Sequence, residues 1–191
     1  MPPSPSLSAS LSLTKKVLQD CSLLIRILPP GGYTSPCSVV QATAGQHVRH
    51  LLHHVSVPVS AAEAAAGEPE EKVTGRRVWE YDVRERGDDV ENCAEAALAK
   101  IASLSDSLSR LAASPPPTSS LLTVAFSTAS SSPSSTPFLS TIEREIMFGA
   151  HHGLHHLAML RVLAEKGGGG GGNLPGDFGK APSTVVFEEK Q

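Results

Sequence analysis

Aromatic residues are scarce in this chain, which has one Trp, two Tyr and five Phe among 191 residues. A surface that stacks single-stranded nucleic acid depends on aromatic side chains, so this kind of surface is not expected. Charge is low as well, with 16 Lys and Arg, 19 Asp and Glu, and a formal net charge of −3. The two signs are interspersed, so the sequence has no basic stripe for nucleic acid. We expect no nucleic-acid partner.

The chain has only three cysteines, Cys21, Cys37 and Cys93, and no CxxC pair. An odd, scattered set argues against a disulfide framework and indicates a reducing compartment. No apolar stretch approaches the roughly 20 residues that a membrane-spanning helix needs, so we expect no membrane partner. The predicted location is the cytoplasm. Residues 1–19 contain no acid and are rich in Ser and Pro, which leaves organelle targeting open.

Several stretches carry apolar residues at helical spacing and end at helix breakers. The first ends at residues 29–32 (PPGG), because proline removes a hydrogen-bond donor and glycine tolerates left-handed geometry. We predict helices at residues 11–28, 40–57, 88–113 and 141–165. Pro58 ends or kinks the second helix, and the Ala-rich residues 61–66 are a candidate extension of it. Helices without sustained alternation with strands favour an all-α fold. The prediction is a four-helix bundle with irregular loops and a C-terminal tail packed on the bundle.

The stretch before the last predicted helix is harder to interpret. Residues 121–126 (LLTVAF) are typical of a short strand, but no partner strand is evident, and residues 127–137 are Ser/Thr/Pro-rich and indicate a loop. Ser140 and Glu143 match a capping box, in which each side chain hydrogen-bonds the other residue's backbone N–H. We therefore expect the last helix to begin there.

The domain organisation follows from composition. Residues 1–10 are predicted to be a disordered tail, and residues 11–187 a single domain. Six consecutive glycines at 167–172 are predicted to be a flexible insertion. They do not form a phosphate-binding loop, because no Lys-Ser/Thr follows them.

The eight histidines fall in two short blocks, one in the second predicted helix and one in the fourth: His47, His50, His53 and His54, then His151, His152, His155 and His156. Side chains four residues apart share one face of a helix, so an HxxxH pair can reach one metal ion. The fourth helix has two such pairs, and periodicity alone leaves open which pair faces the core. In the second helix His47, His50 and His54 share a stripe. Three neutral imidazoles suit Zn²⁺ best and also accept Ni²⁺, Fe²⁺ or Mn²⁺.

Residues 44–52 (AGQHVRHLL) and 151–158 (HHGLHHLA) resemble the DinB-like (damage-inducible) superfamily of metal-binding four-helix bundles. Residues 81–86 (YDVRER) and 178–184 (FGKAPST) are similar to segments of an uncharacterised branch of that superfamily. The resemblance covers most of residues 11–187, without the glycine run. It implies a bundle of the DinB-like type.

The resemblance also implies a metal site. Its first ligand would be His50, with His47 as the alternate, and the HxxxH pair would be His152 and His156. Residues 157–159 are Leu-Ala-Met where relatives carry Arg-Gly-Gln, which weakens any transfer of substrate-side roles. Some relatives are thiol-dependent transferases or isomerases, so a low-molecular-weight thiol is a candidate partner.

We hypothesise that His50, His152 and His156 hold one divalent ion that activates a small nucleophile. The reaction would be that of a metal-dependent hydrolase or thiol-dependent transferase acting on a small molecule. Glu145 lies seven residues before His152 on nearly the same helical stripe. It is a candidate general base or hydrogen-bond partner of a ligand, and the opposite interpretation is a solvated helix carboxylate.

Arg84 and Arg86 have two interpretations: they bind an anionic substrate, or they hold their loop to the helices by ion pairs. For the whole chain, the alternative to an enzyme is a non-catalytic metal-binding or small-ligand-binding module. A structural metal site is closed by a fourth protein ligand, whereas a catalytic one keeps a position open. A homodimer through an exposed helix face is compatible with the pattern, although no apolar stripe requires one.

Overall fold

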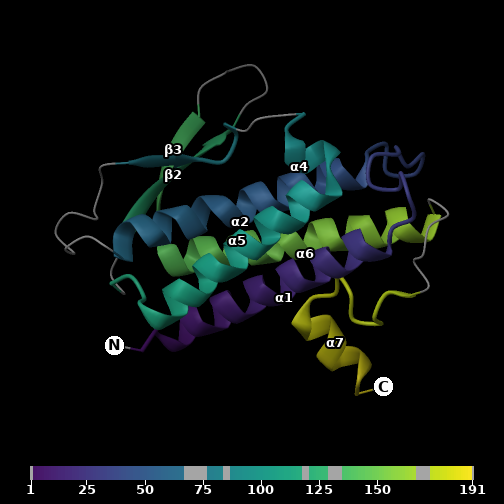
Figure 1. Ribbon diagram of the computed structural model, residues 1–191. Coiled ribbons are helices and arrows are strands. Elements are labelled where there is room, and N and C mark those ends of the chain that lie inside the picture. The colour runs from purple at the N-terminus through teal and green to yellow at the C-terminus, as the bar shows by residue number, and fades with distance from the viewer. Residues whose placement is uncertain are drawn as a thin grey trace.

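The computed structural model describes residues 2–66, 77–83, 87–117, 121–128, 135–166 and 173–190. Within these residues the helices are α1 (Pro5–Ile27), α2 (Ala44–Ala66), α4 (Asp89–Asn92), α5 (Ala94–Ala113), α6 (Ile142–Lys166) and α7 (Pro182–Glu188). The strands are β1 (Val78–Glu80), β2 (Leu121–Ser127) and β3 (Ser135–Thr141). The long helices α1, α2, α5 and α6 run beside one another, and the strands lie at one end of them, next to α2 (Figure 1).

The predicted all-α four-helix bundle is wrong, because the described residues also contain a mixed sheet and the fold is α/β. The sheet order is β1-β2-β3, with β1 parallel and β3 antiparallel to β2. Residues 135–137, part of the expected loop, begin β3 and pair with residues 125–127. Most side chains of β3 are exposed, so the strand is specified by pairing with β2 and not by its own composition. The pairing with β2 is not visible in the sequence of residues 135–141 alone.

The core lies where α6 packs against α1 and α2. Side chains at helical spacing on these helices are almost fully buried, including Leu18, Leu51, Leu157 and Leu160. Burying a leucine side chain contributes roughly 1.5–3 kcal/mol, so each of these leucines stabilises the contact between the helices. It also brings the two histidine-bearing helices, α2 and α6, side by side.

Helix α2 starts later than predicted, and it includes the Ala-rich residues 61–66 that were its candidate extension. Thr43 and Gln46 form a reciprocal capping box: the Gln46 N–H donates to Thr43 Oγ1 (3.1 Å), and the Thr43 N–H donates to Gln46 Oε1 (3.0 Å). The helix then passes through Pro58 to Ala66. Proline has no N–H, so it leaves the carbonyl of His54, four residues earlier, without its helical donor. A glycine of α6 packs over that carbonyl, as described below.

The N-terminal residues belong to the fold. Helix α1 begins at Pro5, with Ser4 as the N-cap, so residues 5–10 are helical where a disordered tail was predicted. The hydroxyls of Ser4 and Ser6 both donate to the Glu143 carboxylate of α6, the latter at 2.6 Å. Glu143 is therefore not the partner of a capping box. The Arg144 N–H is instead accepted by Thr141 Oγ1 at 3.2 Å.

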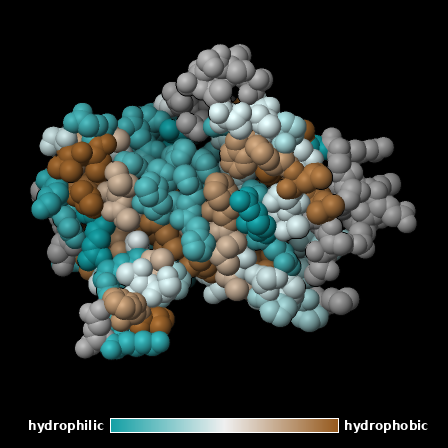
Figure 2. All heavy atoms as spheres, turned by 180° about the vertical axis from the view of Figure 1, so that it is seen from behind, coloured by the Kyte–Doolittle hydropathy of each residue, from teal (hydrophilic) through white to brown (hydrophobic). Residues whose placement is uncertain are grey.

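The C-terminal segment returns to α6. Phe178 is 1 % exposed, and Arg161 of α6 donates from Nη1 to the Phe178 carbonyl at 3.1 Å. Gly179 has φ +68°, and a Cβ there would lie 2.8 Å from the Ala158 backbone nitrogen, so a side chain has no room. Helix α7 then protrudes from the helices (Figure 1) and exposes Val186 and Phe187. Figure 2 shows this segment from behind, with both apolar and polar residues on its surface. In the described part of the chain, no helix has the length and apolarity to cross a membrane.

Gly149 allows α2 and α6 to approach closely, and this gives a testable prediction. A Cβ at Gly149 would lie 2.6 Å from the His54 carbonyl oxygen and 3.5 Å from Pro58 Cγ. We expect Gly149→Ala to destabilise the fold by about 1–3 kcal/mol, because overpacking forces the helices apart. Chemical denaturation followed by circular dichroism measures the change.

Gly176→Ala is the matched control, since a Cβ at Gly176 meets no atom within 4 Å. We expect its midpoint to match that of the unmodified protein. Equal effects of the two substitutions would contradict the role assigned to the close approach.

Candidate metal centre

Three histidines from two helices meet where α2 and α6 are in contact. His50 and His54 of α2 and His152 of α6 each offer a ring nitrogen, and these nitrogens all lie within 4.8 Å of one another. The group could therefore hold a metal ion. His54 is buried, and the other two are partly buried, so solvent competes weakly for their lone pairs.

Two close contacts centre on His152 Nε2. It lies 3.0 Å from His50 Nε2 and 3.1 Å from His156 Nε2. A neutral imidazole nitrogen carries one proton or one lone pair, so His152 Nε2 cannot make a full hydrogen bond with both neighbours. Two nitrogens bound to one ion at about 2.0–2.1 Å in tetrahedral geometry are about 3.3–3.4 Å apart, slightly more than either distance. Histidine nitrogens that cannot all hydrogen-bond to one another are candidates to bind a cation.

The tautomer of His54 is set by the helix itself. Its Nδ1 lies 3.1 Å from the His50 carbonyl oxygen, which can only accept, so Nδ1 carries the proton. The lone pair is then on Nε2. A backbone carbonyl holding one ring nitrogen is the usual way in which a metal-binding histidine is oriented. The sequence placed His54 on the same stripe as His50, but the preference for His50 rested on the resemblance.

The other histidines lie outside the group of three. His47 lies with its Nδ1 3.0 Å from His156 Nδ1, so it contacts the cluster through His156. His53 donates from Nε2 to the Tyr81 carbonyl at 2.9 Å. His151 and His155 are exposed. The convergent group His50, His54 and His152 thus contains two of the three predicted ligands. The third, His156, contacts this group through His152 Nε2, and the histidines of the other HxxxH pair are exposed.

Burial keeps these imidazoles neutral. It is the main cause that lowers the pKa of His156 to about 2 and of His54 to about 3, and neighbouring histidines lower both further. The pKa values of His47 and His152 are also lowered, again mainly by burial. At neutral pH, protons therefore compete poorly with a metal ion for these lone pairs.

Glu145 is fully buried at the start of α6, so the interpretation as a solvated carboxylate does not hold. Its Oε2 accepts the Tyr81 hydroxyl at 2.8 Å. Its Oε1 accepts the Ser140 hydroxyl at 2.6 Å and Arg144 Nη1 at 2.5 Å. Both oxygens are thus occupied by donors that hold α6 to the sheet. This arrangement supports a structural role more directly than that of a general base.

An aromatic layer joins this network to the histidines. The Tyr81 ring stacks on Phe126 with centroids 4.7 Å apart, and lies 5.2 Å from the His54 ring. Phe148 lies 5.9 Å from the His152 ring on the α6 side. The layer therefore packs against the rings of His54 and His152.

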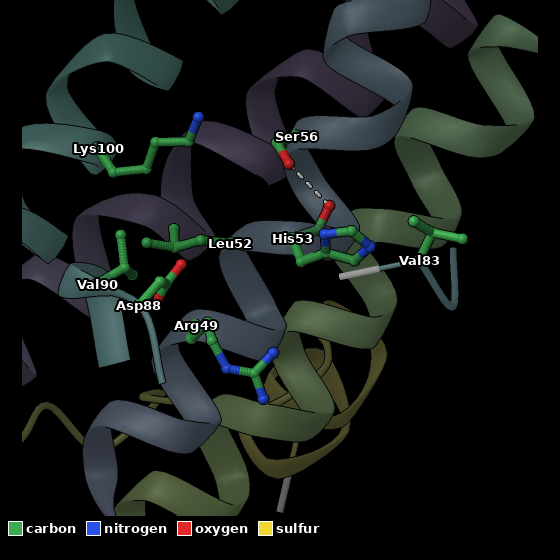
Figure 3. Close-up of a pocket in the computed structure, with 8 residues that line it drawn as sticks. All are labelled: Arg49, Leu52, His53, Ser56, Val83, Asp88, Val90 and Lys100. Carbon is green, nitrogen blue, oxygen red and sulfur yellow. Dashed lines mark hydrogen bonds between the residues drawn. The ribbon is translucent and has the colours of Figure 1, made fainter. Parts of the chain in front are cut away.

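A pocket of about 240 Å³ lies on the flank of α2, where Arg49, His53 and Ser56 line it (Figure 3). Its walls carry the cations Arg49 and Lys100, the anion Asp88 and the His53 ring. The His53 ring is also 5.8 Å from that of His54, so it lies between pocket and cluster. Arg84 and Arg86, predicted to contact substrate, lie outside the described residues.

Comparisons with known proteins add no identification. No family model matches the chain, and neither a curated protein nor a solved structure does.

The lowered pKa values predict how the stability of the metal-free protein depends on pH. Histidines with folded pKa values below the ordinary 6.5 stay neutral in the folded protein but gain protons in the unfolded chain as pH falls below 6.5. We expect the free energy of unfolding to be highest above pH 6.5 and to fall between pH 6.5 and 5. Each such group contributes up to about 1.4 kcal/mol per pH unit.

Urea unfolding at several pH values in the presence of a chelator measures this slope. His151→Ala is the control, because His151 is exposed and its removal should leave the slope unchanged. A stability that stays flat or rises from pH 6.5 to 5 would contradict the burial argument.

Removing the Tyr81 hydroxyl tests the network around Glu145. We expect Tyr81→Phe to destabilise the fold by about 1–3 kcal/mol, because a buried carboxylate oxygen loses its donor. The same change made in a Glu145→Gln background should cost clearly less, and a double-mutant cycle of unfolding energies measures the difference. Strict additivity would show that the two side chains do not interact.

Proposed function

We propose that the protein binds one divalent metal ion between α2 and α6 and uses it on a small molecule. The observation that carries the proposal is the convergence of ring nitrogens from His50, His54 and His152, which all lie within 4.8 Å of one another. His156 Nε2 is 3.1 Å from His152 Nε2 and offers a further nitrogen at the edge of this group. A cation placed among them would accept their lone pairs.

Zn²⁺ is the proposed ion, because neutral imidazoles at about 2.0–2.1 Å in tetrahedral geometry are typical of its sites. Ni²⁺, Fe²⁺ and Mn²⁺ are the alternatives that the same donors accept. A bound divalent ion with an open position lowers the pKa of a water or thiol ligand. The proposed reaction class is therefore hydrolysis or thiol-dependent transfer, and the resemblance to DinB-like proteins favours a low-molecular-weight thiol.

The chain's own residues would supply orientation and exclusion of water. The layer of Tyr81, Phe126 and Phe148 covers one side of His54 and His152. The pocket beside His53 offers space for a small molecule, with side chains of both charges on its walls. Its volume is near the lower end of the roughly 300–1,000 Å³ of ligand pockets, so a small polar substrate fits this role best.

A non-catalytic module is the second candidate, and His54 favours it. The Nε2 lone pair of His54 is fixed by the Nδ1 bond to the His50 carbonyl. His54 would then join the other three histidines as a fourth ligand and close a tetrahedral site. The number of histidines bound to the ion separates the two functions: three with a solvent molecule support catalysis, and four support a structural or sensory site.

Metal stoichiometry tests the proposal. We expect about one equivalent of Zn²⁺ per chain by elemental analysis after reconstitution and desalting, in protein without a His tag. His50→Ala and His152→Ala should each lower the affinity for the metal by at least about tenfold, because each removes a donor. Competition with a chromophoric chelator measures the affinities.

His151→Ala is the matched control on α6, because His151 is exposed. This variant should bind the metal as tightly as the unmodified chain does. His54→Ala decides between the functions. A loss as large as that of His152→Ala supports the closed site, and a small effect supports the open one. Absence of metal in the reconstituted protein, or equal affinities across the whole series, would end both candidates.

A further inference from the structure

His47 contacts the histidine cluster through the Nδ1 atom of His156. Its Nδ1 is 3.0 Å from His156 Nδ1, while the other nitrogen of His156, Nε2, is 3.1 Å from His152 Nε2. The two nitrogens of His156 thus face in different directions, Nδ1 toward His47 and Nε2 toward His152. The single proton of neutral His156 is on Nδ1, which faces His47, or on Nε2, which faces His152.

We propose that His47 is a positioning residue that sets the tautomer of His156 and is not itself a metal ligand. This inference rests on the proposed metal site. For His156 Nε2 to present a lone pair to the ion, its proton must be on Nδ1. His47 Nδ1 then accepts that proton's hydrogen bond, which fixes the ring of His156. His47 in turn carries its own proton on Nε2.

The protons balance between the two states of the pair. With His156 protonated on Nε2, His47 donates from Nδ1 to His156 Nδ1. With the ion bound, the proton of His156 moves from Nε2 to Nδ1 and that of His47 from Nδ1 to Nε2. Each ring stays neutral, so this exchange releases no proton to solvent.

The surroundings of His47 support an outer role. Its Nε2 is buried and has no hydrogen-bond partner among the residues that the structure describes. His47 is also not one of the three histidines whose ring nitrogens converge within 4.8 Å. Its backbone is held in place by the capping box one residue earlier. Gly45 adds a close contact, since a Cβ there would lie 1.9 Å from the Glu91 carbonyl oxygen. A rigid helix start therefore holds the imidazole against His156.

Two substitutions separate this role from a packing role. His47→Leu fills similar space but accepts no hydrogen bond, and we expect about 10–100-fold weaker Zn²⁺ binding. His47→Gln offers an amide oxygen to His156 Nδ1–H and should bind close to the unmodified chain. His155→Leu and His155→Gln are the controls, because His155 is exposed, and both should bind normally. Unfolding of each metal-free variant reports any loss of fold.

The ligand set and the tautomer are read directly. With Co²⁺ in place of Zn²⁺, the visible spectrum of His47→Gln should equal that of the unmodified chain, since no ligand is lost. In ¹⁵N-labelled protein with Zn²⁺, the ring signals of His156 should report a protonated Nδ1.

Each remaining outcome overturns the inference. Equal weakening by His47→Leu and His47→Gln would remove the acceptor role, and a Co²⁺ spectrum that loses one nitrogen ligand would make His47 a ligand. Normal binding by His47→Leu would overturn this inference and leave the proposed function intact. No binding by the unmodified chain would remove both.

Discussion

The close approach of α2 to α6 at Gly149 is the constraint on which the candidate site depends. Pro58 removes the helical donor of the His54 carbonyl, and Gly149 has no side chain to keep α6 away from that oxygen. One turn further along α6, His152 Nε2 therefore reaches His50 Nε2 at 3.0 Å. A wider spacing between the helices would leave two separate histidine clusters.

The sheet supports that arrangement from one end. Tyr81 follows β1, stacks on Phe126 of β2 and donates to Glu145 at the start of α6. The same ring lies beside His54. A carboxylate that is fully buried needs such donors, because burying an unpaired charge is costly. Tyr81 and Phe126, which come from the sheet side, thus link the start of α6 to His54. A four-helix bundle without the sheet would lack this link.

The histidines can be ordered by what holds them. His54 is held by a backbone carbonyl of its own helix, whereas His156 contacts the imidazole of His47 on the other helix. The first arrangement follows from helix geometry, and the second requires two helices to be docked. The rings of His54 and His156 both contact His152. The orientation of the histidines around His152 is therefore set partly by local helix structure and partly by packing between helices.

The sequence by itself determined the features that depend on neighbours along the chain. Helical spacing predicted the long helices, and the HxxxH pattern predicted two histidines on one face of α6, because side chains four apart meet in any helix. Only the tertiary structure decided that His152 and His156 face α2, that β3 is a strand and that Glu145 is buried by its donors. Each of these is decided by a residue distant in sequence, so no local pattern of residues carries it.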